Sequence, residues 1–304
     1  MISNTHPQIA VVIGLVSTED KERIFEALAS LDEQQGEIVC EVILADRRQD
    51  EISAEIARRY RSVRVIPCHP GMSLPTMRTL AFEASSAPIV AVTEDHCVPS
   101  AGWLGEVLSA MEDSTVAAVG GCVVNGVTDT PLDWATFLCE YSAFSPPVAE
   151  GNTSALPGMN VAYRRTALAA MDRRRLTEGF WETTVHPVLA ADGAKFLSRN
   201  SMVMNHCKKF SFGLFAEQRF LYSRYYASLR FPQHRIFHRL ASALASVLLP
   251  TLLLGRMQKA AAAKGLSREF LSASPILFAF VLIWSFGEGV GYLLGDGDSL
   301  AKIE

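Results

Sequence analysis

Three ionisable side chains follow a strongly apolar run of the sequence. Glu94, Asp95 and His96 come one residue after "APIVAV", and a proline and a glycine follow them. Acidic groups and an imidazole at the carboxyl end of a strand can hold a divalent cation, which in turn can hold a diphosphate. The same residue types are also ordinary at a solvated strand-to-turn junction. The spacing by itself leaves both interpretations open.

The composition limits the classes of protein to be considered. The chain has 304 residues, of which 49% are hydrophobic, and a formal net charge of -4. This length can form one large domain or two smaller ones, and the slight acidity argues against a nucleic-acid binder. The six cysteines are scattered singly, without a CxxC pair, so we expect reduced thiols in a cytosolic domain. The N-terminus lacks the basic region of a signal peptide, which predicts a catalytic domain in the cytoplasm.

Residues 8–124 alternate short apolar runs with segments of helical period, a pattern typical of a mostly parallel α/β sheet. Ligands of such sheets bind beyond the carboxyl ends of the strands, where Asp46 and the Glu94–His96 cluster fall. No GxGxxG or GxxxxGK[ST] motif follows the first run, so a phosphate would be bound in another way. The runs are "QIAVVIGLV", "IVCEVILAD", "VRVIPC", "PIVAVTED" and "VAAVGGCVV".

Residues 125–207 show a mixed pattern, which we expect to extend the same sheet and to build a second wall over the site. It reads as a helix in "PLDWATFLCEYSAF", a strand in "GMNVAYRR", a helix in "FWETTVHPVLAADG" and a strand in "AKFLSRNSMVMNH". The predicted domain is therefore 1–231, with halves 1–124 and 125–231.

The composition changes after residue 207. Aromatic and basic residues alternate up to Phe231, and two uncharged or nearly uncharged runs follow, 240–254 and 270–294, of which the second contains Glu288. We predict that residues 232–304 form a membrane-associated helical hairpin whose basic flank faces the cytoplasm. A pair of buried helices in a soluble protein is the alternative. Basic residues in the connecting loop and Pro250 leave a re-entrant or interfacial first segment open.

Over residues 8–230 the chain resembles a family-2 glycosyltransferase with the GT-A fold. The order and spacing of several stretches carry the resemblance, since no single motif is very specific. These stretches are "QIAVVIGLVSTEDKERIFEALASL", "CEVILADRRQDEISAEIARRY", "VRVIPCHPGMSLPTMRTLAFEASSAPIVAVTEDHCVPSAGWL" and "GMNVAYRRTAL". The resemblance implies a nucleotide-sugar donor and a divalent cation.

The resemblance also implies roles for residues of the nucleotide half. Asp46 matches the acid that contacts the nucleotide base or ribose, and Arg78 matches an arginine beside the nucleotide. Glu94 and Asp95 match the first two residues of the family's DxD region. His96 stands where a metal-binding aspartate is usual. His206 matches a position where some relatives supply a further metal ligand.

Imidazole ligands suit Mn(II) better than Mg(II), so we expect a site that favours manganese and uses His96 and His206. Arg47 replaces a second acid that is frequent in the family, so the nucleotide is not defined. The sequence lacks the QxxRW of processive polysaccharide synthases, which favours the addition of one sugar.

In the second half, the resemblance implies that Trp181 and Glu182 occupy the family's "ED" pair. Glu182 is then the general base, with Glu178 and His186 as substitutes. Gly158 and Asn160 are expected on the sugar or acceptor wall, together with Trp181.

The function implied is an inverting, metal-dependent hexosyltransferase of the cell envelope. It would lie at the inner membrane with its catalytic domain on the cytoplasmic side, and it would use a lipid-linked or membrane-proximal acceptor. Two alternatives stay open: a processive polysaccharide synthase and a non-catalytic nucleotide-sugar-binding membrane scaffold. A sugar-nucleotide pyrophosphorylase would need a phosphate loop that the first strand lacks.

Overall fold

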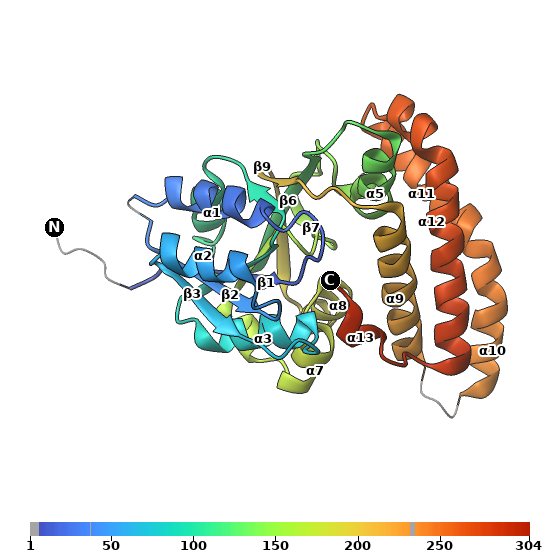
Figure 1. Ribbon diagram of the computed structural model, residues 1–304, viewed down its shortest axis with the longest axis horizontal. Helices are drawn as coiled ribbons and strands as arrows, with labels where there is room; N and C mark the ends of the chain where they lie inside the picture. Colours follow the sequence, from blue (N-terminus) through green and yellow to red (C-terminus); the bar gives the residue numbers. More distant parts are fainter. Residues whose placement is uncertain (1–5, 37, 232–234) are drawn as a thin grey trace. The chain divides into compact units, whose positions relative to one another are not determined.

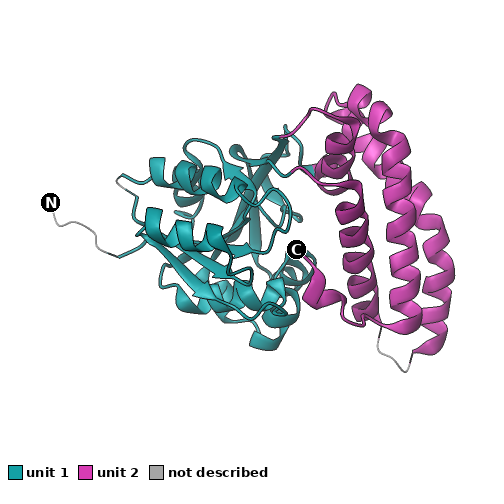
Figure 2. Ribbon diagram, viewed as in Figure 1, with its two compact units in different colours: residues 1–126, 144–208 teal, residues 127–143, 209–304 magenta. Residues whose placement is uncertain are grey.

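The computed structural model describes residues 6–36, 38–231 and 235–304. The chain divides into two compact units (Figure 2): residues 1–126 and 144–208 form unit 1, and residues 127–143 and 209–304 form unit 2. The boundary predicted between residues 231 and 232 separates the glycosyltransferase-like domain from the membrane-associated hairpin, and it stays a prediction. The units themselves separate earlier along the chain, because the helices at 131–141 and 212–230 belong to unit 2.

Unit 1 is a mixed sheet flanked by helices (Figure 1), as the sequence predicts. Its strand order is β3-β2-β1-β4-β8-β6-β9-β5, and β7 pairs with β9. The strands are β1 (Ile9–Leu15), β2 (Cys40–Asp46), β3 (Val63–Pro67), β4 (Ile89–Glu94), β5 (Cys97–Pro99), β6 (Val116–Asn125), β7 (Gly151–Thr153), β8 (Val161–Arg164) and β9 (Lys195–His206).

The helices of unit 1 are α1 (Arg23–Glu33), α2 (Glu51–Arg59), α3 (Leu74–Ala84), α4 (Trp103–Ala110), α6 (Arg165–Ala169), α7 (Arg173–Gly179) and α8 (Glu182–Ala191). Each of the five predicted apolar runs is a strand, and β1 is buried at every residue because helices cover both faces. Short capping side chains fix where helices begin: the Ser73 hydroxyl accepts from the Thr76 N–H at the start of α3, with Pro75 in the first turn.

The parallel strands at the centre bring the expected polar residues to one edge. β1 lies between β2 and β4, with Leu15 opposite Asp46 and Gly14 opposite Glu94. The two carboxylates therefore flank the end of β1. The antiparallel pairing of β5 with β9 sets Cys97 opposite His206, which brings the end of the last strand to the same edge.

Unit 2 is helical and contains the predicted hairpin. Its elements are α5 (Pro131–Tyr141), α9 (Phe212–Arg230), α10 (Ile236–Ala245), a 3-10 turn (Ser246–Leu248), α11 (Leu249–Ala263), α12 (Ser267–Leu294) and α13 (Ser299–Lys302). Residues 236–263 and 267–294 are each 28 residues long and apolar enough to cross a membrane. The first stretch is longer than the run of 240–254 suggested, because helix continues on both sides of it.

Pro250 explains the 3-10 turn in this first stretch. A proline has no N–H to donate to the carbonyl four residues earlier, here that of Ser246. The hydroxyl of Ser285 on α12 donates to that carbonyl instead, at 2.7 Å. The Ser246 carbonyl thus has a hydrogen-bond donor within unit 2, and this bond helps to hold residues 236–263 against α12.

Two glycines allow α9 and α12 to approach closely. A Cβ on Gly287 would overlap Ser223 and the Phe220 carbonyl, and one on Gly291 would overlap the Arg224 carbonyl. We expect Gly291→Ala to lower the free energy of unfolding by about 1–3 kcal/mol, because α9 must move. Gly255→Ala, at a site on α11 with open space, should be neutral or slightly stabilising. Chemical denaturation of both variants in mild detergent tests this, and equal stability of the two would contradict it.

Candidate functional site

The site is built around a two-residue turn between β4 and β5. Glu94 ends β4 and Cys97 begins β5, so Asp95 and His96 form the turn itself. Because Cys97 pairs with His206, the ring of His206 lies beside that of His96, with centroids 4.8 Å apart and an edge-to-face arrangement. The two imidazoles that the sequence suggested as metal ligands are therefore neighbours.

Glu94 belongs to the same group. One carboxylate oxygen, Oε2, lies 3.3 Å from Nε2 of His96. Burial alone would raise the pKa of Glu94, but its hydrogen bond with His96 and the nearby charges lower it to about 2. Burial and the nearby His96 charge lower the pKa of His206 to about 3, so His206 is neutral at pH 7. An anionic carboxylate and a neutral imidazole are the forms that bind metals. Burial alone would lower the pKa of His96, but its hydrogen bonds with Asp95 and Glu94 raise it, so a cation bound by His96 would have to displace a proton.

Cys97 also has its sulfur within 4.8 Å of the ligand atoms of Glu94 and His96. Burial, with the Glu94 charge, raises the pKa of Cys97 well above its ordinary value, so the thiol keeps its proton. A thiol is a poor ligand compared with a thiolate. Ligand atoms of Glu94, His96 and Cys97 thus lie within 4.8 Å of one another, and His206 adjoins this group through the contact of its ring with that of His96. Sulfur suits Mn(II) and Mg(II) less well than carboxylate or imidazole does.

Asp95 does different work from Glu94. Its Oδ2 accepts from the N–H groups of Val16 and Ser17, each at 3.0 Å, and its Oδ1 accepts from the Ser17 hydroxyl. It also lies 3.0 Å from Nδ1 of His96, and it is only 2% exposed. Asp95 therefore anchors the loop after β1 and orients the His96 ring.

Two buried cations behind Asp95 were not found from the sequence. Lys208, 2% exposed, donates from Nζ to the Ser17 hydroxyl at 3.1 Å. Arg48 donates to the Ser17 carbonyl at 3.2 Å and lies 3.7 Å from the Asp95 carboxylate. The position of Lys208 two residues after His206 was the available signal. These cations give the loop after β1 a positive charge beside the acidic turn.

Asp46 ends β2 on the other side of β1 and is buried. Its Oδ1 accepts from the backbone N–H groups of Arg48 and Gln49, which shapes the turn before α2. Oδ2 takes part in no hydrogen bond with the described residues. Arg47, which replaces a frequent acid, is buried and donates to the Met72 carbonyl at 3.1 Å.

Arg78 on α3 joins the acidic turn to the second half of unit 1. Its guanidinium donates to Glu94 at 3.3 Å and to the carbonyl of Phe180 at 3.1 Å. Phe180 and the buried Trp181 directly precede Glu182, the first residue of α8. One buried side chain thus connects the cluster around Glu94 to the segment that carries the expected base.

Gly158 provides the space for Glu182. A Cβ at residue 158 would overlap the Glu182 carboxylate, so any larger residue there would have to push that carboxylate aside. Asn160, two residues later, is fully buried and uses its polar atoms inside the fold: it accepts from the Trp103 indole and donates to the carbonyls of Cys122 and Met202. Gly158 lies against Glu182, as expected of a residue on the sugar or acceptor wall. Asn160 is enclosed within the sheet and exposes no atom that a ligand could contact.

The two substitute bases lie in other environments. Glu178 is at the surface of α7 and pairs with Arg174 at 2.8 Å. His186 is buried on α8, and its Nε2 lies 2.9 Å from the Tyr163 hydroxyl. Neither arrangement resembles that of Glu182 beside Gly158.

The buried His186 predicts a pH dependence of stability. Burial lowers its pKa to about 4, so the folded protein takes up this proton less readily than the unfolded chain. The stability that depends on neutral His186 is complete above pH 6.5 and is lost as the pH falls toward 4. Between pH 6.5 and 5, wild type should lose about 2 kcal/mol more unfolding free energy than His186→Gln, whose amide can still accept from Tyr163. Denaturation at both pH values tests this, and equal losses would contradict it.

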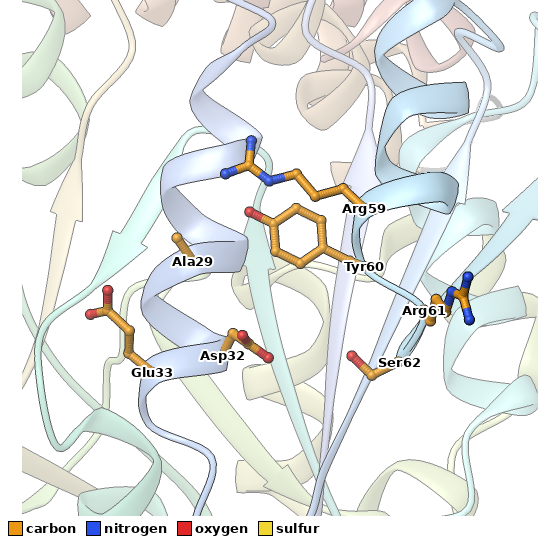
Figure 3. Close-up of a pocket in the computed structure, with 7 residues that line it drawn as sticks. All are labelled: Ala29, Asp32, Glu33, Arg59, Tyr60, Arg61 and Ser62. Atoms are coloured by element: carbon orange, nitrogen blue, oxygen red, sulfur yellow. The ribbon is translucent and has the colours of Figure 1, made fainter.

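A separate hollow of about 570 Å³ lies between α1 and the link from α2 to β3 (Figure 3). Its lining includes both acidic and basic side chains, and none of the residues discussed above contributes to it. The lining residues are Ala29, Asp32, Glu33, Arg59, Tyr60, Arg61 and Ser62. Its position at the opposite ends of the strands separates it from the site around Glu94.

Comparison with known proteins gives a family and a fold. The model of a family described as Glycosyl transferase family 2 matches residues 14–174. No curated protein sequence matches the chain. Among solved structures, the mannosyltransferase PcManGT from Pyrobaculum calidifontis, in complex with GDP-Man and Mn²⁺, is similar over 90% of this chain and 88% of its own, at 15% identity and a TM-score of 0.52.

A second similar structure is that of GalNAc-T7 with UDP, GalNAc and Mn²⁺. The likeness covers 68% of this chain and 45% of that protein, at 13% identity and a TM-score of 0.51. At these identities the two structures establish the fold alone. Together with the sheet of unit 1 and the two long apolar helices, they confirm the predicted GT-A-type architecture with a C-terminal hairpin.

Proposed function

Because the chain belongs to glycosyl transferase family 2, we propose that it transfers a single sugar from a nucleotide-sugar donor to an acceptor hydroxyl. The observation that carries the proposal is the convergence of Glu94, His96 and His206 at the edge where β1, β2 and β4 end. The two similar structures contain GDP-Man or UDP and GalNAc, which supports a donor of this class with a hexose-type sugar.

Glu94, His96 and His206 would hold a divalent cation. When bound, it would supply positive charge to the diphosphate that leaves with the nucleotide. Two imidazoles in a set of three ligands favour Mn(II) over Mg(II). Mn²⁺ in both similar structures supports the use of a divalent cation.

The donor would lie across the ends of the central strands. Asp46 has one carboxylate oxygen left for the base or ribose, and Arg78 borders the nucleotide while its guanidinium holds Glu94 in place. Asp95 contributes indirectly, by fixing the loop at Val16 and Ser17. The charge of Lys208 behind that loop favours a diphosphate nearby.

Glu182 would act as the general base. Its carboxylate takes the proton of the acceptor hydroxyl while that oxygen attacks the anomeric carbon, and the bond to the diphosphate oxygen breaks. A single displacement of this kind inverts the configuration of that carbon. Arg78, through the Phe180 carbonyl, keeps the segment before Glu182 beside the acidic turn, and Trp181 and Gly158 would form the sugar wall.

Gly158→Ala tests the position of the base without changing the base itself. The added methyl group overlaps the Glu182 carboxylate and must displace it. We expect kcat to fall by at least about 100-fold while the KM for the donor changes little, because displacing a base removes general-base catalysis. Gly105→Ala on α4, where a Cβ meets open space, is the matched control. Equal activity of the two variants would show that Glu182 is not held where the proposal needs it.

The acceptor is proposed to be lipid-linked or close to a membrane. Fifteen large apolar side chains are exposed among the described residues, and all of them lie between residues 212 and 294, in unit 2. This distribution supports a membrane-associated part that begins near residue 232 and a catalytic part ahead of it. We propose that it lies at the inner membrane with its catalytic part in the cytoplasm, since the basic flank at Arg235 and Arg239 suits the anionic cytoplasmic leaflet.

The donor class can be tested by ligand-dependent stabilisation. UDP-, GDP- and dTDP-sugars are added to the purified full chain with Mn(II) or with EDTA, and Tm is measured. We expect one nucleotide class to raise Tm with Mn(II) and to lose most of this effect with EDTA. The absence of any shift across the panel, in a protein that unfolds cooperatively, would contradict a nucleotide-sugar site.

A further inference from the structure

The long apolar helix α12 lies in the middle of unit 2. It contacts α9, α5, α10 and α11, and Figure 1 shows it between α9 and α10. The ring of Phe280 packs against Phe212 and Phe215 of α9, and Gly287 meets the backbone of α9 at Phe220. Other helices of unit 2 therefore cover part of α12. The rest of its surface exposes large apolar side chains, which are Leu271, Phe278, Leu282, Phe286, Leu293 and Leu294.

The helices that cover α12 carry charges at its middle. Arg219 of α9 and Glu140 of α5 form a 2.5 Å ion pair, of which both side chains are largely buried. The guanidinium lies 5.5 Å from the ring of Trp284, near the middle of the apolar run 270–294. If α12 crossed a bilayer, this pair would lie deep in the hydrocarbon region, where charged groups are costly.

Two further arginines of α9 lie beside the second half of α12. Arg230 pairs with Glu288 at 2.9 Å and contacts the hydroxyl of Tyr292, and Arg224 donates to the carbonyl of Gly295. The only acidic residue in the apolar run is thus neutralised from α9. Charged groups of α9 and α5 therefore lie along the middle and the second half of α12.

The layer formed by α10 and α11 has the opposite character. It packs against α12 on one side and exposes apolar side chains on the other, including Phe237 at 86% and Leu244 at 77% exposure. The other exposed apolar side chains of this layer are Ile236, Leu240, Val247, Leu248 and Leu252. Such a continuous apolar face on a folded surface indicates a partner.

The charge of this layer indicates which partner. Residues 235–268 contain six Lys or Arg side chains and no Asp or Glu, in a chain whose net charge is -4. Four of these cations, Arg235, Arg256, Lys259 and Arg268, are exposed, and they lie at the two ends of the apolar face. Cations that flank an apolar face are complementary to an anionic lipid surface, whose headgroups lie next to its acyl chains.

We infer that unit 2 binds a membrane in its plane, through the outer face of α10 and α11, and that α12 does not cross the bilayer. The apolar side chains from Ile236 to Leu252 enter the acyl region, and the flanking cations bind anionic headgroups of the same leaflet. The inference rests on the membrane association proposed above but not on sugar transfer, so its tests do not measure activity.

The first test compares the sides of the membrane reached by two single cysteines. All six native cysteines are buried, so background labelling should be low. Ala262→Cys places a thiol at the exposed tip of the hairpin, and Asp192→Cys places one on the exposed surface of unit 1. Both are treated with a membrane-impermeant maleimide in intact cells and in inverted vesicles.

An in-plane hairpin predicts that both thiols react in the same preparation, whichever side that is. Reaction of Ala262→Cys in one preparation and of Asp192→Cys in the other would show that the hairpin crosses the membrane and would overturn the inference. Melting curves that match wild type show that both variants are folded.

The second test measures the contribution of charge. Flotation of the full chain is compared with vesicles of phosphatidylcholine alone and with vesicles that also contain phosphatidylglycerol. The variant Arg256→Ala/Lys259→Ala should bind the anionic vesicles about tenfold or more weakly than wild type. Arg173→Ala/Arg174→Ala removes the same charge from unit 1 and should bind as wild type does. Equal binding by all three proteins, or no vesicle binding by wild type, would contradict the inference.

Discussion

Replacement of Glu182 by Gln is expected to lower kcat for sugar transfer by about 100- to 10 000-fold, the usual contribution of a general base. Glutamine keeps the size of the side chain beside Gly158 but cannot take the proton of the acceptor hydroxyl. The affinity for the donor should change little, because the donor is proposed to bind at the ends of β1, β2 and β4. Initial rates and donor binding, measured separately on the purified full chain, give both quantities.

The matched control for this variant is Glu178→Gln. Glu178 lies four residues earlier, pairs with Arg174 at the surface and should be dispensable for transfer. A loss of activity in Glu178→Gln that equals the loss in Glu182→Gln would reassign the base. Full activity in Glu182→Gln would remove Glu182 from the mechanism.

The second large effect is expected at the proposed metal ligands. His96→Ala removes one of three ligands, and we expect the affinity for Mn(II) to fall by at least about 100-fold and metal-dependent transfer to be lost. Titration of Mn(II), followed by electron paramagnetic resonance of the free ion, measures the affinity without any need for activity.

Cys97→Ala is the control for that experiment. Its sulfur lies within 4.8 Å of the ligand atoms of Glu94 and His96, but sulfur is a soft ligand that suits Mn(II) less well than carboxylate or imidazole does. We therefore expect Cys97→Ala to bind Mn(II) as wild type does. Unchanged Mn(II) affinity in His96→Ala, together with weakened binding in Cys97→Ala, would mean that the cation is held by a different set of side chains.

The sheet could be predicted because its strands are continuous apolar runs that end in polar residues. β1 is buried along its whole length, and a run of that kind is typical of a strand covered on both faces. The position of Asp46 and Glu94 at one edge follows from the parallel pairing alone. The neighbourhood of His96 and His206 rested on the family resemblance, because a local pattern does not show that β5 pairs with β9.

The different roles of Glu94 and Asp95 could not be read from the sequence. Neighbouring residues at the end of a strand point in opposite directions, and either one can face the ligand. The N–H groups of Val16 and Ser17 bind Asp95, and these residues are far away in the chain. The role of Asn160 could not be predicted either, because its three hydrogen-bond partners come from three distant segments of the chain.

The sequence also did not show which helices pack against one another. α5 and α9 show helical patterns, but the pattern does not say which surface covers their apolar faces. Both pack on α12, and α9 supplies the arginines that neutralise Glu140 and Glu288. The apolar run 270–294 is long enough to span a membrane, and the sequence does not show that arginines of α9 lie beside it.

The most direct test of the central claim is turnover of the donor by the purified full chain. Release of nucleotide from UDP-, GDP- and dTDP-sugars is measured with Mn(II), Mg(II) or EDTA, with and without a lipid extract as acceptor. We predict metal-dependent release from one nucleotide class, stimulated by the extract and lost in His96→Ala and Glu182→Gln. Tight binding of a nucleotide sugar without any release, even with the lipid extract, would contradict the claim and would indicate a non-catalytic nucleotide-sugar sensor or scaffold at the membrane.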